Sequence, residues 1–461
     1  MNLKIAYIGG GSMNWARVFM SDLALEPSLS GEIRLYDIDM EAAKRNEVIG
    51  NRISSERKTK RFSQGGKWHY TTAGSLHEAL AGADFVIISI LPGTFEHMRS
   101  DVHLPERLYI YQPVGDTVGP GGTIRALRTI PHYVRFAEAI RAYAPDAWVI
   151  NYTNPMSLCV RTLYHVFPQI KAFGCCHEVF GTLELLASMM EKETGIRPSR
   201  KDIKINVTGL NHFTWFTEAS AHETDLMTIF SRFAQTHFDS GFPNDDSSLP
   251  DVCFSCTNKV KFDLFRKYGL IPSAGDRHLA EFMPGDIYLR DPKTIKSWGF
   301  YLTSVDWRVK DREQKIEFTK RLVSGEQMPV IKPSGEEGIL LIKALCGLTN
   351  VTSNVNLPNS AGQIADLPED TVVETNAVFS QNKVLPVKTG TVPDSIRELL
   401  IPHVMNQSKV MSAALNCDRE AVYSAFEREP LISGKISSTK LQALADDMIK
   451  NTIDELPGGW K

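Results

Sequence analysis

The first 180 residues alternate short apolar runs with amphipathic segments, and this alternation limits the fold more than any other feature of the chain. Such alternation is typical of βαβ units, which build a parallel sheet covered by helices on both faces. The predicted strands are 4–9, 33–38, 68–72, 85–90, 147–153 and 170–176. The predicted helices are 15–25, 41–55, 124–143, 155–166 and 181–191. We therefore expect an α/β fold with a doubly wound Rossmann-type sheet, which binds its ligand beyond the carboxyl ends of the strands.

The pattern changes near residue 195, and the rest of the chain reads as a mixed α+β region. Residues 203–221 are strand-like, and 372–387 are typical of a hairpin. Helices are predicted near 311–322, 335–345, 394–416 and 439–455. We expect a dinucleotide-binding domain over 1–195, and a domain over 196–461 that supplies catalytic groups, substrate contacts and subunit contacts.

Composition excludes several other classes of protein. With 51 Lys+Arg against 54 Asp+Glu, the net charge is −3, which argues against a nucleic-acid partner. The longest apolar run, 85–91, is far shorter than the roughly 20 residues that cross a bilayer, so no membrane span is expected. Seven cysteines form no even disulfide framework, and the amino terminus carries no signal-peptide pattern. These features favour the reducing cytoplasm.

Residues 9–14 carry a glycine-rich turn between the first strand and the first helix. Gly9, Gly10, Gly11 and Ser12 suit the close approach of a pyrophosphate to backbone N–H groups and a helix N-terminus. Asp37 ends the second predicted strand, where a carboxylate binds the ribose hydroxyls and repels a 2′-phosphate. This pattern favours NAD over NADP. The alternative is a glycine turn of another doubly wound protein, with Asp37 as a helix cap.

The connection over 91–122 shows no clear periodicity and is long for a compact domain, which is typical of a lid or substrate loop. Arg99, Asp116 and Arg125 lie in or just after it. They are candidates for contacts with a substrate, and ordinary salt bridges explain them equally well.

Polar residues follow strands five and six. Asn154 precedes Pro155 and is either a helix cap or a ligand contact. Cys176 and His212 are candidate metal ligands, because thiolate and imidazole both bind divalent transition ions. The alternatives are a buried apolar cysteine and a hydrogen-bonded core histidine. Cys253 and Cys256 have zinc spacing but no second pair, and we interpret them as structural.

Taken together, these motifs resemble the NAD- and manganese-dependent glycosidases of glycoside hydrolase family 4, which share a fold with lactate and malate dehydrogenases. The resemblance covers nearly the whole chain. Its motifs are residues 8–12, 119–122, 151–155, 176–179 and 209–212. The tetrapeptide Cys-His-Glu-Val at 176–179 looks like that of the α-galacturonidase subgroup.

The resemblance implies a reaction outside the usual two-carboxylate scheme. Bound NAD takes a hydride from sugar C3, which acidifies the C2 proton. The aglycone then leaves by elimination, water adds, and the hydride returns. The metal polarises the new carbonyl. Thiolate ligation alone favours Zn²⁺ or Fe²⁺, but the resemblance implies Mn²⁺.

Residue roles also follow from the resemblance. It implies Cys176 and His212 as metal ligands, and Asn154 as a substrate contact. His177 is the expected acid, and Glu178 is a second candidate. Asp276 is the expected C2 base.

A uronate glycoside requires an arginine fork for its carboxylate. Arg277 is the first candidate and Arg99 the second. A homodimer or homotetramer is implied by the family.

Three alternatives remain open. The chain could act on α-glucosides, α-galactosides or α-glucuronides within the same family. It could be an NAD-dependent 2-hydroxy acid dehydrogenase, which would accumulate NADH in proportion to product. A non-enzymatic NAD sensor is the third reading.

Overall fold

The computed structural model describes residues 1–56, 67–243, 252–432, 434 and 436–460. The strands of the large sheet are β1 (Asn2–Ile8), β2 (Ser30–Tyr36), β3 (Trp68–Thr72), β4 (Phe85–Ile88), β5 (Trp148–Asn151), β6 (Lys171–Gly174), β11 (Val351–Pro358), β12 (Val372–Ser380) and β13 (Lys383–Pro386). The second sheet consists of β7 (Ile203–Leu210), β8 (Phe213–Ala221), β9 (Thr224–Asp225) and β10 (Ile271–Pro272).

Helices cover both sheets. In the first half they are α1 (Trp15–Leu25), α2 (Met40–Glu56), α3 (Leu76–Leu80), α4 (Phe95–His103), α5 (Gly119–Tyr143), α6 (Met156–Val166) and α7 (Glu178–Thr194). Further along they are α8 (Leu226–Thr236), α9 (Lys259–Tyr268), α10 (Asp276–Glu281), α11 (Gly285–Tyr288), α12 (Pro292–Ser297) and α13 (Val305–Ser324). The last are α14 (Gly338–Leu345), α15 (Asp394–Asn416), α16 (Arg419–Arg428) and α17 (Ser438–Lys450).

The large sheet confirms the predicted doubly wound fold. Its order is β13-β12-β11-β6-β5-β4-β1-β2-β3, and the six strands from β6 to β3 are parallel. The order reverses between β1 and β4, which is where doubly wound sheets bind ligands. All six predicted strands are present.

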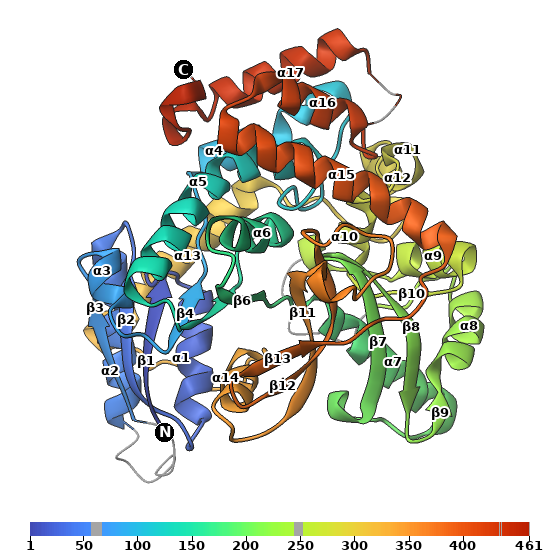
Figure 1. The fold of residues 1–461 in the computed structure, drawn as a ribbon. Coiled ribbons are helices and arrows are strands. Elements are labelled where there is room, and N and C mark those ends of the chain that lie inside the picture. Colours follow the sequence, from blue (N-terminus) through green and yellow to red (C-terminus); the bar gives the residue numbers. More distant parts are fainter. Residues whose placement is uncertain (57–66, 244–251, 433, 435, 461) are drawn as a thin grey trace.

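Three antiparallel strands extend this sheet and were not predicted as part of it. The hairpin β12–β13 is confirmed, but β11 joins it to β6 through the pairing of Asn356 with Gly174. Strand β11 was not predicted because its buried positions include Asn354 and Asn356, which interrupt the apolar run expected of a buried strand. The large sheet therefore contains strands from both sides of the predicted domain boundary at residue 195 (Figure 1).

The connection over 91–122 is not the continuous loop that was predicted. It contains α4, which begins with a capping box between Thr94 and His97, and α5 already begins at Gly119. The inner face of α4 carries the buried polar residues His97 and Asp101, and Asp101 pairs with the buried Arg128. Polar residues on the buried face conceal the apolar periodicity that predicts a helix.

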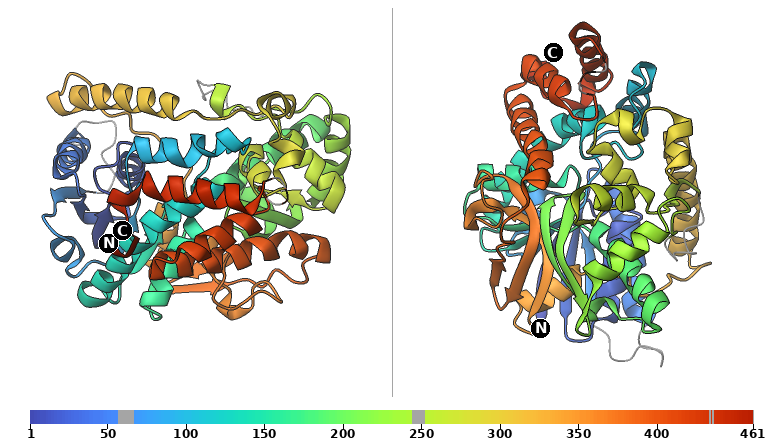
Figure 2. Two further views of the ribbon diagram at one scale, coloured as in Figure 1. Left: turned by 90° about the horizontal axis from the view of Figure 1, so that it is seen from above. Right: turned by 90° about the vertical axis from the view of Figure 1, so that its right-hand side faces the viewer.

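The second sheet packs beside the first. Asn376 in β12 donates from Nδ2 to the carbonyl of Ile205 in β7, at 2.6 Å. The right-hand view of Figure 2 shows α15–α17 gathered at one end of the molecule, and the left-hand view shows α13 running alongside helices of the first half. Arg17 of α1 donates to the hydroxyl of Thr319 in α13 at 2.7 Å. No helix in the described ranges is both long and apolar enough to cross a membrane.

Candidate active site

The glycine turn has the geometry of a dinucleotide site. Gly9 has φ +93°, and a Cβ atom there would lie 1.9 Å from the backbone oxygen of Ser89. The N–H groups of Gly9 and Gly10 both donate to the carbonyl of Tyr36, at 2.9 Å. The turn is thus fixed between the ends of β2 and β4, and only glycine fits at its first position.

Asp37 does not cap the following helix, because Asp39 occupies that position and accepts from the N–H of Ala42. One carboxylate oxygen of Asp37 accepts from the N–H of Gly11 at 2.8 Å, and the other accepts from the N–H of Asp39 at 2.9 Å. Burial raises the pKa of Asp37 above its ordinary value, against the opposing effect of these two amides. Its position at the end of β2 is the one in which a carboxylate meets an adenosine ribose.

A second group of polar residues lies beyond β5 and β6. Pro155, not Asn154, is the N-cap of α6, so the cap interpretation of Asn154 is wrong. The Asn154 side chain instead donates to Asp116 at 3.1 Å, and its Oδ1 is buried with no protein partner. Thr117 joins Asp116 to His212, because its hydroxyl lies 2.7 Å from the carboxylate and 2.8 Å from Nδ1 of the imidazole.

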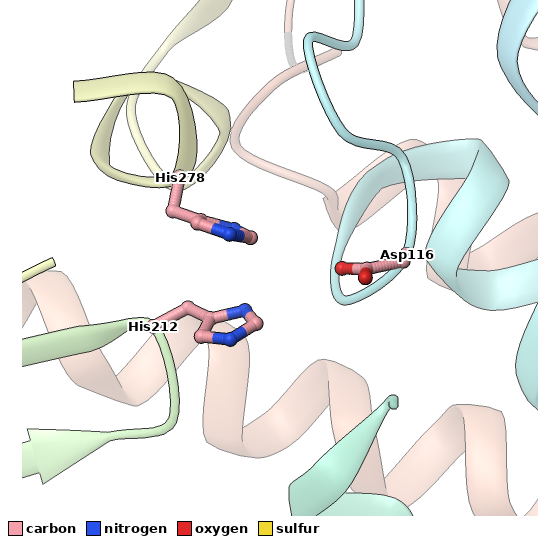
Figure 3. Close-up of side chains that lie close together, drawn as sticks. All are labelled: Asp116, His212 and His278. Atoms are coloured by element: carbon pink, nitrogen blue, oxygen red, sulfur yellow. The ribbon is translucent and has the colours of Figure 1, made fainter. Parts of the chain in front are cut away.

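Among the described residues, Asp116, His212 and His278 lie close enough together to hold one metal ion (Figure 3). One ligand atom of each lies within 4.8 Å of the other two. The imidazole rings of His212 and His278 have centroids 3.8 Å apart. His212 has φ +65° in the two-residue turn between β7 and β8, which divides the stretch that was predicted as one strand.

The charges of this group favour metal binding. Burial alone would raise the pKa of Asp116, but the Arg125 guanidinium and both imidazoles hold it well below its usual range. Burial lowers the pKa of His212 to about 3, so its imidazole is neutral at ordinary pH. An ionised carboxylate beside the neutral His212 imidazole is a donor set that suits divalent transition ions.

Cys176 is not a member of this group. It is buried against Met156, Val160 and Val372, and burial raises its pKa well above the ordinary value. Its side chain hydrogen-bonds with Asn211, the neighbour of His212 in the turn. The pairing of Cys176 with His212 on one metal therefore stays a prediction.

His177 and Glu178 flank the same region. His177 is half exposed, and its ring centroid lies 5.6 Å from that of Trp15. Glu178 begins α7 and accepts from the N–H of Gly275 at 2.9 Å. Burial would raise the Glu178 pKa, but His278 and the neighbouring histidines lower it to about 2. Glu178 is therefore ionised at neutral pH and has no proton to donate.

The remaining predicted residues have other partners. Asp276 is fully buried, and its oxygens accept from the N–H groups of Val260 and Lys261 at 3.2 and 3.1 Å. Arg277 donates to the carbonyl of Pro113 at 2.8 Å. Arg99 pairs with Asp306 at 2.8 Å near the surface.

Sequence reasoning gave too little weight to two residues. Asp116 was only one of several loop charges, and no role was predicted for His278. Both gain significance from distant partners, because they approach His212 from the 109–118 connection and from α10 (Figure 3). The glycines that surround Asp116 in 115–122 were the available signal.

Glu281 holds the loop that carries Asp116, and this gives a prediction about stability. One oxygen accepts from the N–H groups of Val114 and Gly115 at 2.6 and 2.9 Å, and burial raises its pKa to about 8. The folded protein then binds a proton that the unfolded chain releases above its pKa of about 4.3. Stability should therefore fall as pH rises from 5 to 8, with a slope on the order of 1 kcal/mol per pH unit from this group.

The variant Glu281→Gln keeps the hydrogen-bond acceptor and removes the titration. Its free energy of unfolding, relative to the native chain, should improve steadily between pH 5 and pH 8. Urea unfolding at several pH values measures this difference. Parallel curves for the two proteins would contradict the prediction.

Two family models match this chain. The model described as family 4 glycosyl hydrolase matches residues 4–192, and that of the family 4 glycosyl hydrolase C-terminal domain matches residues 207–432. A relative named α-galacturonidase from Lachnoclostridium phytofermentans is 55% identical, over 100% of this chain and 98% of its own length. The chain belongs to glycosyl hydrolase family 4.

Solved structures agree with this membership. A Bacillus subtilis protein assigned as a glucosidase is 48% identical and has a TM-score of 0.91, over 97% of this chain and 100% of its own. A 6-phospho-α-glucosidase from gut microorganisms, solved with NAD and Mn²⁺, has a TM-score of 0.82 at 21% identity, over 99% of both chains.

The malate dehydrogenase of Naegleria fowleri has a TM-score of 0.50 at 11% identity, over 90% of this chain and 99% of its own. The expected family and the dehydrogenase-like fold are both confirmed.

Proposed function

We propose that this family 4 enzyme is an α-galacturonidase that uses NAD and Mn²⁺. The observation that carries the proposal is the full-length similarity to a relative of that name, together with Cys-His-Glu-Val at 176–179. The NAD-bound and Mn²⁺-bound relative supports the choice of cofactors.

Both cofactors fit the residues present. The turn at Gly9–Gly11 leaves no room for a Cβ atom, and Asp37 directly follows β2, as a pyrophosphate and a ribose require. His212 and Asp116 supply nitrogen and oxygen donors within reach of one ion, and His278 adds a third. When bound, NAD supplies a reversible hydride acceptor and the metal a Lewis acid.

The proposed roles of the side chains follow from their surroundings. Cys176 and His212 hold the metal, as the resemblance implies, and Asp116 and His278 are further donors. Asn154 orients the sugar hydroxyls with its free Oδ1.

His177 is half exposed and donates a proton to the departing aglycone. Glu178 is the stronger candidate for the C2 base, because a backbone amide engages only one of its oxygens, whereas both oxygens of Asp276 accept from backbone amides.

The test is hydrolysis of 4-nitrophenyl α-D-galacturonide in D₂O. With NAD and Mn²⁺ we expect turnover, deuterium at C2 of the released sugar, and no NADH in proportion to product. Cleavage without NAD, or retention of hydrogen at C2, would contradict the proposal. Hydrolysis of neutral α-glycosides alone would reject the uronate, and stoichiometric NADH would indicate a dehydrogenase.

The same exchange experiment assigns the base. Glu178→Gln should abolish deuterium incorporation at C2, whereas Asp276→Asn should retain it if the protein folds. The reverse result would return the role to Asp276. Circular dichroism of both variants separates loss of chemistry from loss of structure.

We further propose that the chain is a cytoplasmic homodimer or homotetramer, with residues 1–195 as the NAD-binding domain. All seven cysteines are free, which agrees with a reducing compartment. Light scattering measures the number of subunits.

A further inference from the structure

Three arginines from separate elements meet beside Asp116. Arg125 lies in α5, Arg277 in α10, and Arg308 in the first turn of α13. Arg277 reaches the entrance of α13 by donating to the Thr303 hydroxyl, and its guanidinium lies over the Phe254 ring at 5.0 Å. The Phe254 ring in turn contacts Trp307, the residue before Arg308, at 5.1 Å between centroids. Arg308 is close enough to Arg125 and Arg277 for their charges to repel.

The hydrogen-bonding capacity of these arginines is mostly unused. Arg125 is 7% exposed, its Nε is buried without a partner, and its ion pair with Asp116 spans 3.8 Å. The Nε of Arg277 is also buried without a partner. Within the described part of the chain, no hydrogen bond or ion pair engages the side chain of Arg308. The buried Nε atoms of Arg125 and Arg277 thus lack the acceptors that such groups normally find.

The charges nearby do not balance. Asp116 and Glu178 are the ionised carboxylates that face the arginines, and Arg125 is the main partner that keeps Asp116 ionised. Glu281 also faces them, but burial raises its pKa to about 8, so it is largely protonated at neutral pH. Burial and the other two arginines lower the pKa of Arg308 to about 10, which still leaves it charged. Three cations therefore face two anions, and an added anion would relieve the remaining repulsion between the arginines.

We propose that Arg308, together with Arg125 and Arg277, forms the subsite that binds the carboxylate of a uronic acid ring. This inference rests on the proposed function, since it assumes a sugar that binds the metal-ligand group through its hydroxyls. Asp116 belongs to that group and pairs with Arg125, so the three arginines lie directly beside the candidate metal ligands. A guanidinium fork matches a carboxylate with two parallel hydrogen bonds, which a neutral hydroxymethyl group cannot accept. Arg308 thereby replaces Arg99, which pairs with Asp306 at the surface.

The test compares two substrates that differ only at this group, 4-nitrophenyl α-D-galacturonide and 4-nitrophenyl α-D-galactoside. In Arg308→Gln, the ratio of their kcat/KM values should fall by about 10- to 100-fold, the loss expected for hydrogen bonds to a charged group. Arg308→Lys should keep only part of the preference, because an ammonium supplies charge without the fork. Calorimetric titration with D-galacturonate should show weaker binding to both variants.

Arg312 provides the matched control. It lies one turn further along α13, is exposed, and contacts the Phe95 ring at 5.5 Å. Arg312→Gln should leave the ratio unchanged. If the native enzyme hydrolyses the galacturonide and both Arg308 variants keep its ratio, the subsite is wrong while the function stands. If the native enzyme does not hydrolyse the galacturonide, the proposed function fails first. If Arg308→Gln does not fold, Arg308→Lys tests the subsite, because lysine keeps the positive charge and a side chain of similar length.

Discussion

Replacement of His212 by alanine is expected to lower kcat/KM by about 10³-fold, because Lewis-acid help from a metal amounts to several kcal/mol. His212 is buried, neutral, and held by Thr117 at 2.8 Å in the group that also contains Asp116. An alanine would keep the turn but remove the nitrogen donor. The variant should therefore bind NAD normally and bind Mn²⁺ weakly, as measured by NAD titration and by electron paramagnetic resonance of Mn²⁺.

His222 offers a control with similar backbone and different surroundings. It also has positive φ, +46°, in the turn between β8 and β9, but its side chain is half exposed and 3.9 Å from Asp202. His222→Ala should leave both activity and Mn²⁺ binding unchanged. If His212→Ala retains full Mn²⁺ affinity and activity, the metal does not bind at this group.

The parts of the fold that could be predicted are the strands and helices whose buried positions are occupied by apolar residues. Strand β4 is buried along its whole length, and its sequence is an uninterrupted apolar run. Strand β11 is as well buried in its middle, but Asn354 and Asn356 fill that space by hydrogen bonding with Glu374 and with the Met156 sulfur. Helix α4 was missed for the same reason, because its buried face carries the polar residues His97 and Asp101. A buried polar residue satisfied by a distant partner leaves no local pattern.

The residues of the candidate site also differ in whether a local sequence pattern reveals them. Gly9 and Asp37 lie in one βαβ unit, so their spacing alone reveals a dinucleotide turn. Asp116 and His278 are far apart in the sequence and become neighbours because the connection before α5 and helix α10 both reach His212 in the β7–β8 turn. Asp276 was predicted as a catalytic base, but it is the first residue of α10, and its buried carboxylate accepts from backbone amides of α9. Site residues that are brought together only by tertiary contacts cannot be predicted from local sequence patterns, and the structure is needed to identify them.

Gly9→Ala is expected to reduce the affinity for NAD by at least about 10²-fold and to reduce turnover with it. The added Cβ would lie 1.9 Å from the backbone oxygen of Ser89, at φ +93°, so the turn must move away from β4. Movement of the turn misaligns the N–H groups that meet the pyrophosphate, and each charge-assisted hydrogen bond lost weakens binding by about 1.5–3 kcal/mol. Fluorescence titration with NAD measures the loss, and circular dichroism verifies the fold.

Gly195→Ala separates the steric conflict from backbone strain. Gly195 also has positive φ, +77°, as the C-cap of α7, but no atom lies within 4 Å of a Cβ placed there. The substitution should therefore cost about 1 kcal/mol of stability and leave NAD affinity unchanged. Equal losses of NAD affinity in the two variants would mean that general destabilisation, and not the contact with Ser89, explains the effect. Unchanged affinity in Gly9→Ala would instead remove the turn from the NAD site, and with it the reason for placing the hydride acceptor at the ends of β1 and β4.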